Sequence, residues 1–326
     1  MDALLSSAEV FLTDGLMYAI LALGFYITYT ILDFPDLSVE GTVLTGGVVF
    51  AILVRANCNP WLAMILAFIS GALAGSVTGL LHVKLHIRPL LCGILVSTGL
   101  ISINLVMTVL GMGGNLRGED ALTTIPLGRT VPNILRTPPA TWIPADVGGF
   151  NLRKLVVFLL VAIVFKLLLD LFLKTKCGLL LRAAGDNSHY VTMLAQDPGN
   201  SKILGLALGN GFAAVSGALI VQSRGNANQS IGLGMVVIGL ASVIIGLSVF
   251  GRIKWMKKTT MVIIGAVIYQ ACLAIATLIG IPTAYNKLIM ALLFTLALIL
   301  SDHVGGKTRR KGGAANVAAH GNKQGL

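Results

Sequence analysis

The sequence predicts an all-α, polytopic membrane protein. Three observations support this fold class: 56% of the 326 residues are hydrophobic, only 11% are charged, and long apolar runs follow one another along the chain. A soluble domain carries about 25% charged residues, so this chain has too few to cover a surface in water. The apolar runs are continuous, whereas a membrane β-barrel shows alternating segments of about ten residues.

A helix needs about 20 apolar residues to cross a membrane. The apolar runs predict about nine spans, of which the second and the last are short: 12–32, 38–54, 61–81, 90–110, 155–173, 203–222, 232–250, 259–280 and 287–301. We therefore expect one transmembrane domain over residues 1–302. Residues 303–326 are rich in Gly, Ala and Lys and predict a disordered tail.

The basic residues predict the orientation, because Lys and Arg collect in cytoplasmic loops. Of the two alternating sets of loops, one holds most of them, in clusters at 84–88, 174–182, 252–258 and 307–311. That set is predicted to be cytoplasmic, which places the N-terminus outside and the C-terminus inside. The net charge of +11 is explained by these clusters and does not predict nucleic-acid binding.

Two features argue against chemistry on this chain. The four cysteines are scattered and form no CxxC pair, so they predict no metal site. No His, Asp, Glu and Ser constellation recurs at helical spacing within the spans, so no catalytic residue is expected. The external loop 111–153 is long and rich in proline. It is either a cap on which a partner docks or a plain connector.

The cytoplasmic loop 174–202 contains the polar stretch "LRAAGDNSHYVTMLAQDPGNSK" at 181–202. Gly185 can end the preceding helix in the left-handed conformation, and Asp186, Asn187 or Ser188 can cap the next helix. We expect that helix over 188–196, closed by Pro198 and Gly199.

Three residues of this short helix lie at a spacing of three to four and form one apolar stripe: Tyr190, Met193 and Leu194. Such an exposed helix, joined to spans at both ends, is either a docking element for a partner or an interfacial helix on lipid.

Residues 177–222 resemble the cytoplasmic loop and following span of ABC importer permeases of the branched-chain amino-acid and ribose type. The matching positions are Gly178, Ala183, Gly185, Asn187, Ser216, Gly217 and Ala218. "DLSVEGT" at 36–42 and the Gly-rich 232–251 are similar to two further elements of that family. The resemblance is closest to the branch often encoded beside an ATPase and a solute-binding lipoprotein. A family glycine before the span is replaced here by "QDP" at 196–198.

The resemblance implies a permease subunit of an ATP-driven importer in the bacterial inner membrane. The loop helix would be the coupling helix, seated in a cytoplasmic ABC ATPase dimer that binds ATP and Mg, so this chain needs no cofactor. A second permease copy and an extracytoplasmic binding protein would complete the system. The substrate would be a small organic solute, an amino acid or a related metabolite.

The stretch "ILDFPDLSVEGT" at 31–42 places three acids between two apolar segments: Asp33, Asp36 and Glu40. Pro35 interrupts any continuous helix. In one interpretation, a discontinuous helix pair lines the translocation path, because broken helices occur at membrane depth only beside cavities or inside protein. In the other, the stretch is a cytoplasmic turn in which Ser38 caps the next helix. The resemblance favours the first.

Other polar residues of the spans have competing interpretations. Asn104 and Asn210 either line the path or join helices by hydrogen bonds. Gly71, Gly75 and Gly79 form a small-residue contact face, within the fold or between subunits. Lys166 and Asp170 are four apart, as in an ion pair along one helix. The alternative function is an ion-coupled secondary transporter that uses Asp33, Asp36 or Glu40.

Overall fold

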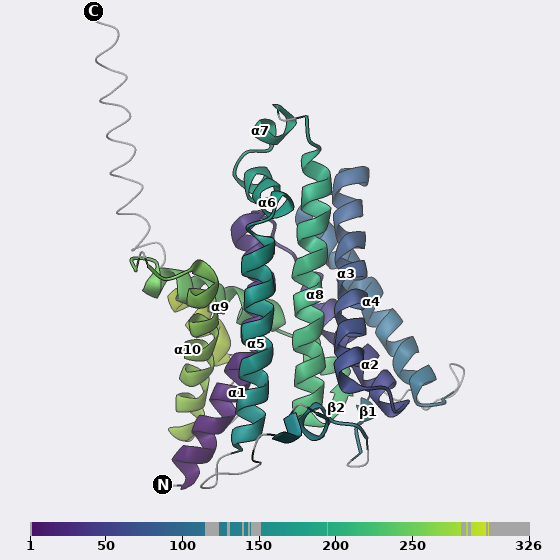
Figure 1. Ribbon diagram of the computed structural model, residues 1–326, viewed down its shortest axis with the longest axis vertical. Helices are drawn as coiled ribbons and strands as arrows, with labels where there is room; N and C mark the ends of the chain where they lie inside the picture. The colour runs from purple at the N-terminus through teal and green to yellow at the C-terminus, as the bar shows by residue number, and fades with distance from the viewer. Residues whose placement is uncertain are drawn as a thin grey trace, which may run out of the picture.

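The apolar runs of the sequence form long helices that stand side by side in one bundle (Figure 1). The computed structural model describes residues 2–114, 124–128, 131–138, 140–142, 144, 151–193, 195–253, 255–281, 285, 288–297 and 299. The α-helices are α1 Asp2–Phe25, α2 Val39–Arg55, α3 Pro60–Leu85, α4 Pro89–Gly111, α5 Leu152–Phe172, α6 Lys176–Asp186, α7 Ser188–Met193, α8 Pro198–Arg224, α9 Met235–Phe250 and α10 Lys258–Leu278.

The shorter elements are a π-helix, three 3₁₀ turns and two strands: η1 Tyr26–Ile31, η2 Ile134–Arg136, η3 Ala140–Trp142, η4 Gln229–Gly232, β1 Thr124–Pro126 and β2 Asn226–Asn228. The π-helix η1 continues α1 without a break in the chain. The strands pair antiparallel, with Ile125 opposite Ala227. They link the long loop before α5 to the connection between α8 and α9.

Seven helices in the described part of the chain are long and apolar enough to cross a membrane: Ala8–Ile31, Pro60–Leu85, Pro89–Gly111, Leu152–Phe172, Pro198–Arg224, Gln229–Phe250 and Lys258–Leu278. They coincide with seven of the nine predicted spans. The remaining two are the ones expected to be short: α2 has 17 residues, and the last described helix is Leu288–Ala297. α2 is short because irregular residues 32–38 precede it, so the helix begins inside the bundle.

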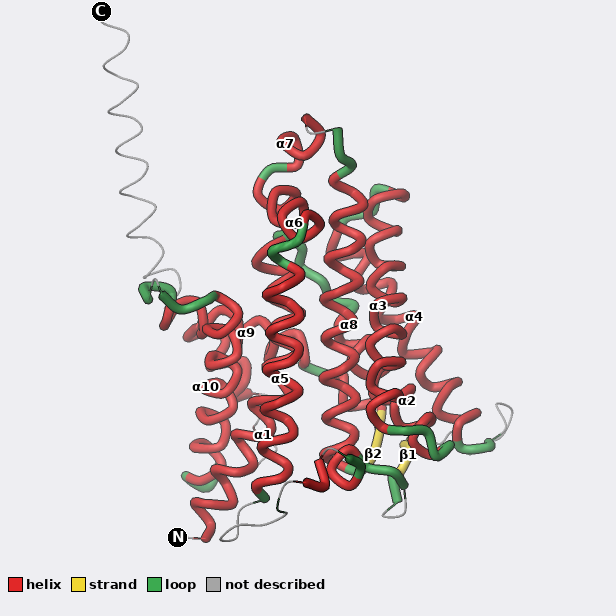
Figure 2. Tube along the Cα trace, in the orientation of Figure 1, coloured by secondary structure: helices red, strands yellow, loops and turns green. Residues whose placement is uncertain are grey.

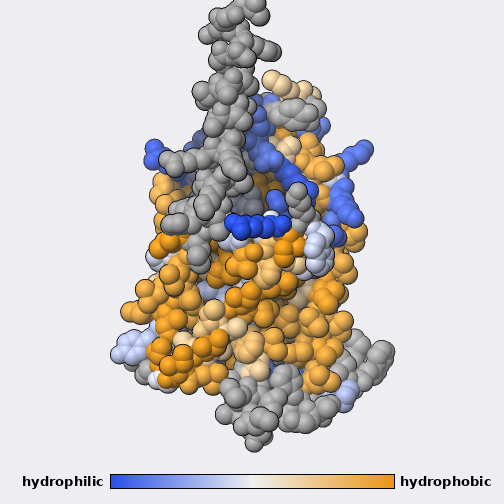
Figure 3. Space-filling model, turned by 90° about the vertical axis from the view of Figure 1, so that its left-hand side faces the viewer, coloured by the Kyte–Doolittle hydropathy of each residue, from blue (hydrophilic) through white to orange (hydrophobic). Residues whose placement is uncertain are grey.

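The two ends of the bundle differ in character. α6 and α7 lie at one end, which we call the α7 end, and the strands lie at the other, which we call the β end (Figures 1 and 2). On the face shown in Figure 3, apolar residues cover the middle of the bundle, and hydrophilic residues gather above them toward the α7 end. This distribution is expected of a protein whose middle lies in lipid.

The centre of the bundle is formed by the first span and α8, since 78% of the apolar window of each is buried. α8 packs against α2 and α3, and α1 packs against α9 and α10. Small residues bring α3 close to α8, because a side chain on Gly75 would collide with the Leu206 carbonyl and one on Gly71 with Ala214. The small-residue face of α3 is therefore a contact within one chain.

The described parts of the proline-rich loop fold back onto the bundle at the β end. Ile125 and Ile134 are completely buried, and the Trp61 indole donates a hydrogen bond of 3.1 Å to the Pro138 carbonyl. This part of the loop is thus packed structure at the β end, and its role as a docking cap or a connector stays a prediction. Most of residues 115–150 and the predicted tail 303–326 lie outside the described residues.

Candidate functional site

The stretch 31–42 forms a helix break, as Pro35 predicts. The π-helix bonds run five residues back, from the Leu32 amide to the Ile27 carbonyl at 3.1 Å. The chain then turns at Asp33, which has a left-handed φ of 52°. α2 begins at Val39, with Ser38 as its N-cap residue, but the Ser38 side chain makes no capping bond. The sequence-based alternative in which Ser38 caps α2 is therefore wrong in its detail.

The Ser38 hydroxyl instead belongs to a buried polar cluster, which we call the Asp36 network: Asp36, Ser38, Thr42 and Asn210. Asp36 Oδ1 accepts hydrogen bonds from the Ser38 amide at 2.8 Å and the Ser38 hydroxyl at 2.6 Å. Asp36 Oδ2 accepts one from Asn210 Nδ2 at 2.7 Å. The Thr42 hydroxyl lies 2.7 Å from Asn210 Oδ1. These contacts join the helix break to the central helix α8.

The network lies deep in the bundle. Asp36 is 2% exposed, and the other three members are completely buried. Asn210 is twelve residues after Pro198 and fourteen before Arg224, the two ends of α8, which places it about 18–21 Å from either end. Among the described residues, no cation forms an ion pair with Asp36. A carboxylate at this depth is costly, and three hydrogen-bond donors stabilise it here.

The other predicted path residues lie apart from the network. Glu40 Oε1 accepts a hydrogen bond of 3.0 Å from the Gly234 amide, at the start of α9. Asn104 Nδ2 donates one of 3.1 Å to the Gly41 carbonyl, so Asn104 joins α4 to α2. Asp33 is exposed. Of the six residues predicted to line the path, hydrogen bonds join Asp36, Ser38 and Asn210. For Asn104 and Asn210, the contacts match the alternative in which these residues join helices.

Thr42 is the member of the network that sequence reasoning missed. It lies four residues after Ser38, one helical turn further along α2, and its hydroxyl lies 2.9 Å from the Ser38 carbonyl. The signal was present in the spacing of Ser38 and Thr42, which places both on one face of α2.

The polar loop at the α7 end forms two helices. α6 begins with Thr175, whose hydroxyl accepts a hydrogen bond from the Gly178 amide. It runs to Asp186, so the prediction that Gly185 ends the helix in the left-handed conformation is wrong. Gly185 has another role, because a side chain there would collide with the carbonyl of Ile31, the last residue of η1. Its lack of a side chain lets α6 rest directly on the π-helix.

α7 is shorter than predicted. The side chain of Asn187 accepts a hydrogen bond of 3.0 Å from the His189 amide, which confirms one of the three proposed caps. The helix ends at Met193, and Ala195 follows with a left-handed φ of 55°. Pro198 does not close this helix but opens α8, whose first turn is capped by Asp197.

The two faces of α7 differ in exposure. Val191 is completely buried against the protein, whereas Met193 is 83% exposed. The short helix thus turns an apolar side chain outward at the α7 end. Leu194 and the side chains of Ser188 and Tyr190 lie outside the described residues, so the predicted stripe is visible only at Met193. Asp186 lines a cavity between α6 and the neighbouring helices.

One ion pair ties two spans together at the α7 end. Lys166 lies 3.2 Å from Asp170, which confirms the predicted pair along α5. Asp170 also contacts Lys257 at 3.0 Å and accepts a hydrogen bond of 2.7 Å from the Thr259 hydroxyl. The carboxylate therefore joins α5 to the start of α10.

Comparisons with known proteins show which sequences the chain is similar to. A family model described as "Branched-chain amino acid transport system / permease component" matches residues 7–298. The chain is 37% identical over 281 residues to a tyrosine transport system permease protein of Clostridioides difficile (strain R20291), covering 86% of each chain. It is 30% identical over 297 residues to the uncharacterized protein RP368 of Rickettsia prowazekii (strain Madrid E), covering 88% of this chain and 95% of that protein. No solved structure matches the chain.

Proposed function

Because the chain belongs to the family of branched-chain amino acid transport permease components, we propose that it is the membrane subunit of an ATP-driven importer for an amino acid. It is a multi-pass membrane protein and a permease component, not a catalytic subunit. In the proposal, ATP and Mg bind to a separate cytoplasmic ATPase dimer, and an extracytoplasmic binding protein delivers the solute. The α7 end would then face the cytoplasm, as the clusters of Lys and Arg indicate.

The packing of α6 on η1 is the observation that carries this proposal. α7 offers the exposed Met193 to a partner. α6, which directly precedes α7 in the chain, lies on the bundle, where Gly185 rests on the Ile31 carbonyl. Five residues after Ile31 stands Asp36, which is bonded to Asn210 on α8. A partner that moves α6 and α7 would act through direct contacts on the helix break.

The Asp36 network is the proposed hinge of this movement. Broken helices at membrane depth need their backbone groups satisfied by other parts of the protein, and the network supplies these bonds in the state described here. We place the path for the solute beside the break, with Asp33, Glu40 and Asn104 around it. The substrate we propose is tyrosine or a branched-chain amino acid, from the name of the C. difficile relative and the description of the family.

A second permease copy would pack on α4. This helix contacts α2 and α3 on one side, and its other side carries the exposed residues Leu95, Thr98, Ser102 and Val106 at helical spacing. A side chain on Gly99 would meet no atom within 4 Å. Small and polar residues on an exposed span favour close packing with another helix, so this face fits a homodimer interface.

The test is co-purification of ATPase activity with the detergent-purified chain. Met193→Glu places a charge on the exposed apolar position and should lower the co-purifying activity at least tenfold, and Tyr190→Glu should act in the same way. Asn200→Glu is the matched control, because Asn200 is exposed in the first turn of α8 at the same end. Equal activity with all three variants would contradict the proposed contact.

The ion-coupled alternative makes a different prediction. A secondary transporter would move the solute in vesicles without any ATPase, at a rate that follows the proton or sodium gradient. The positions of the three acidic residues do not favour ion coupling. Asp36 accepts three hydrogen bonds, Glu40 accepts one from the Gly234 amide, and Asp33 is exposed. Uptake of labelled tyrosine or leucine that persists without ATP would overturn our proposal.

A further inference from the structure

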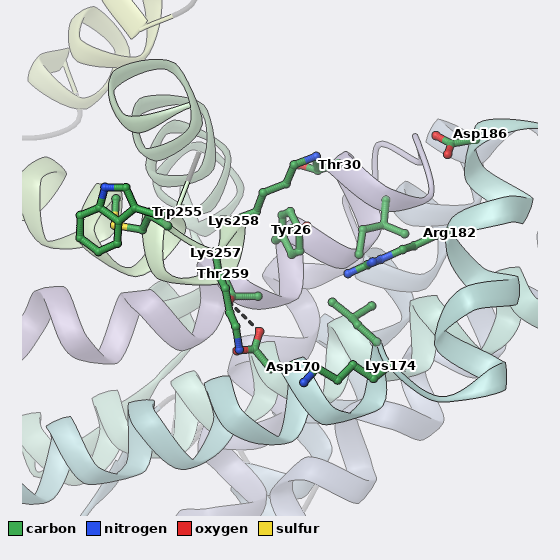
Figure 4. Close-up of a pocket in the computed structure, with 13 residues that line it drawn as sticks. Tyr26, Thr30, Asp170, Lys174, Arg182, Asp186, Trp255, Lys257, Lys258 and Thr259 are labelled. Atoms are coloured by element: carbon green, nitrogen blue, oxygen red, sulfur yellow. Dashed lines mark hydrogen bonds and ion pairs between the residues drawn. The ribbon is translucent and has the colours of Figure 1, made fainter. Parts of the chain in front are cut away.

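A cavity of about 540 Å³ opens at the α7 end, apart from the Asp36 network (Figure 4). Its walls are the π-helix η1, the end of α5, helix α6 and the turn before α10. Its size lies within the range of about 300–1,000 Å³ that is usual for small-molecule sites. The cavity contains side chains that neither the helix break nor the α7 surface uses.

The cavity is electropositive. Lys174, Arg182, Lys257 and Lys258 line it, together with two carboxylates. One of these, Asp170, is already engaged by Lys166, Lys257 and Thr259. In the described part of the chain, no carboxylate lies within ion-pair distance of Lys174, Arg182 or Lys258. The side chains of Arg182 and Lys258 come from opposite sides of the cavity (Figure 4).

A free hydroxyl group adds a second, independent observation. Thr30 lines the cavity, and its Oγ1 is buried without a hydrogen-bond partner. Other helical threonines donate to the carbonyl four residues back, as Thr13 does at 2.7 Å and Thr108 at 2.8 Å. Thr30 lies in the π-helix, where the bonding pattern shifts to five residues. The π-helix thus leaves an unpaired donor buried behind the wall of a basic cavity.

The surroundings of the cavity are those of a membrane surface. The last residues of the α5 span and the first of the α10 span border it. Trp255 at its rim is 87% exposed, and tryptophan is typical of the boundary between lipid and water. Beside the cavity, α5 exposes Leu167 and Leu171, which offer an apolar surface to acyl chains.

We propose that this cavity binds the phosphate headgroup of an anionic phospholipid. Arg182 and Lys258 contact the phosphate oxygens, the Thr30 side chain turns so that its buried Oγ1 donates a hydrogen bond to one of them, and the acyl chains lie along α5. Basic pockets between spans on the cytoplasmic side suit such headgroups. The lipid would bridge η1, α6 and α10, and so stabilise α6 where it rests on Ile31.

The test is native mass spectrometry of the detergent-purified chain after titration with phosphatidylglycerol or phosphatidylethanolamine. The wild type should retain phosphatidylglycerol in preference to phosphatidylethanolamine. Arg182→Gln with Lys258→Gln should weaken retention of phosphatidylglycerol about 30-fold, which corresponds to about 2 kcal/mol. Thr30→Val, which keeps the size of the side chain, should weaken it several-fold.

The matched control is Lys84→Gln with Lys202→Gln, which removes the same charge from positions that do not line the cavity. This control should retain phosphatidylglycerol like the wild type. Equal retention of both lipids, or equal loss in the control and the Arg182 and Lys258 variant, would overturn the proposal. Displacement of the lipid by inorganic phosphate at millimolar concentration would also overturn it, because the site would then take a free anion. The measurement needs no ATPase, so its failure would leave the proposed importer function standing.

Discussion

The buried carboxylate of Asp36 leads to a quantitative prediction about Asn210. Asn210→Leu replaces the amide by an apolar side chain of similar size. The change removes the 2.7 Å hydrogen bond to Asp36 Oδ2, which is the only bond to that oxygen among the described residues. It also removes the 2.7 Å bond from the Thr42 hydroxyl to Asn210 Oδ1, but that hydroxyl keeps the Ser38 carbonyl as an acceptor. A hydrogen bond to a charged group contributes about 1.5–3 kcal/mol, and the carboxylate stays buried at 2% exposure. We therefore expect the free energy of unfolding to fall by about 2–3 kcal/mol.

The assay is reversible unfolding in mixed detergent, followed by circular dichroism. The matched control is Ser216→Ala on the same helix, which removes a buried bond of 2.9 Å to the Met17 carbonyl. That bond joins two neutral groups, so its loss should cost only about 0.5–1.5 kcal/mol. If Asn210→Leu costs no more than Ser216→Ala, Asp36 does not depend on Asn210 and the reasoning is refuted.

A double-mutant cycle separates charge from packing. Asp36→Asn removes the charge and keeps an acceptor for the Ser38 amide and hydroxyl. In that background the neutral amide nitrogen stands in place of Oδ2 and accepts no hydrogen bond from Asn210 Nδ2, so Asn210→Leu should lower the free energy of unfolding by at least about 1 kcal/mol less than in the wild type. Identical costs in the two backgrounds would show that Asn210→Leu acts by altered packing alone.

Two other predictions follow from contacts at the α7 end. Gly185→Val should lower the midpoint of thermal unfolding and the yield of folded protein, because its side chain collides with the Ile31 carbonyl. Lys176→Val, at an exposed position in the first turn of the same helix, should leave the midpoint nearly unchanged. Equal midpoints for the two variants would contradict the close packing of α6 on η1. Asp170→Asn should lower the free energy of unfolding by about 1–2 kcal/mol. The loss should be smaller in 1 M NaCl, because Lys257 is 57% exposed and salt screens its ion pair with Asp170. A cost that is independent of salt would indicate that the hydrogen bond to Thr259 dominates.

The sequence by itself determined the solvent of this protein and most of its helices. Seven of the predicted spans are full-length helices, since an apolar run of that length in lipid has to satisfy its own backbone. Local spacing was also sufficient for the Lys166–Asp170 pair, because both partners lie within one turn of a helix. It limited the cap of α7 to three neighbouring residues, and the structure shows the capping bond at Asn187.

Tertiary structure alone decided which residues meet across helices. Asp36 and Asn210 are 174 positions apart, and whether they meet depends on the rotation and depth of α2 and α8, which periodicity along one chain does not specify. Gly185 illustrates the same limit: the sequence predicts a turn, while the structure uses the missing side chain for contact with Ile31. A pattern of residue types records which face is small or polar, and only the packed bundle determines what lies against that face.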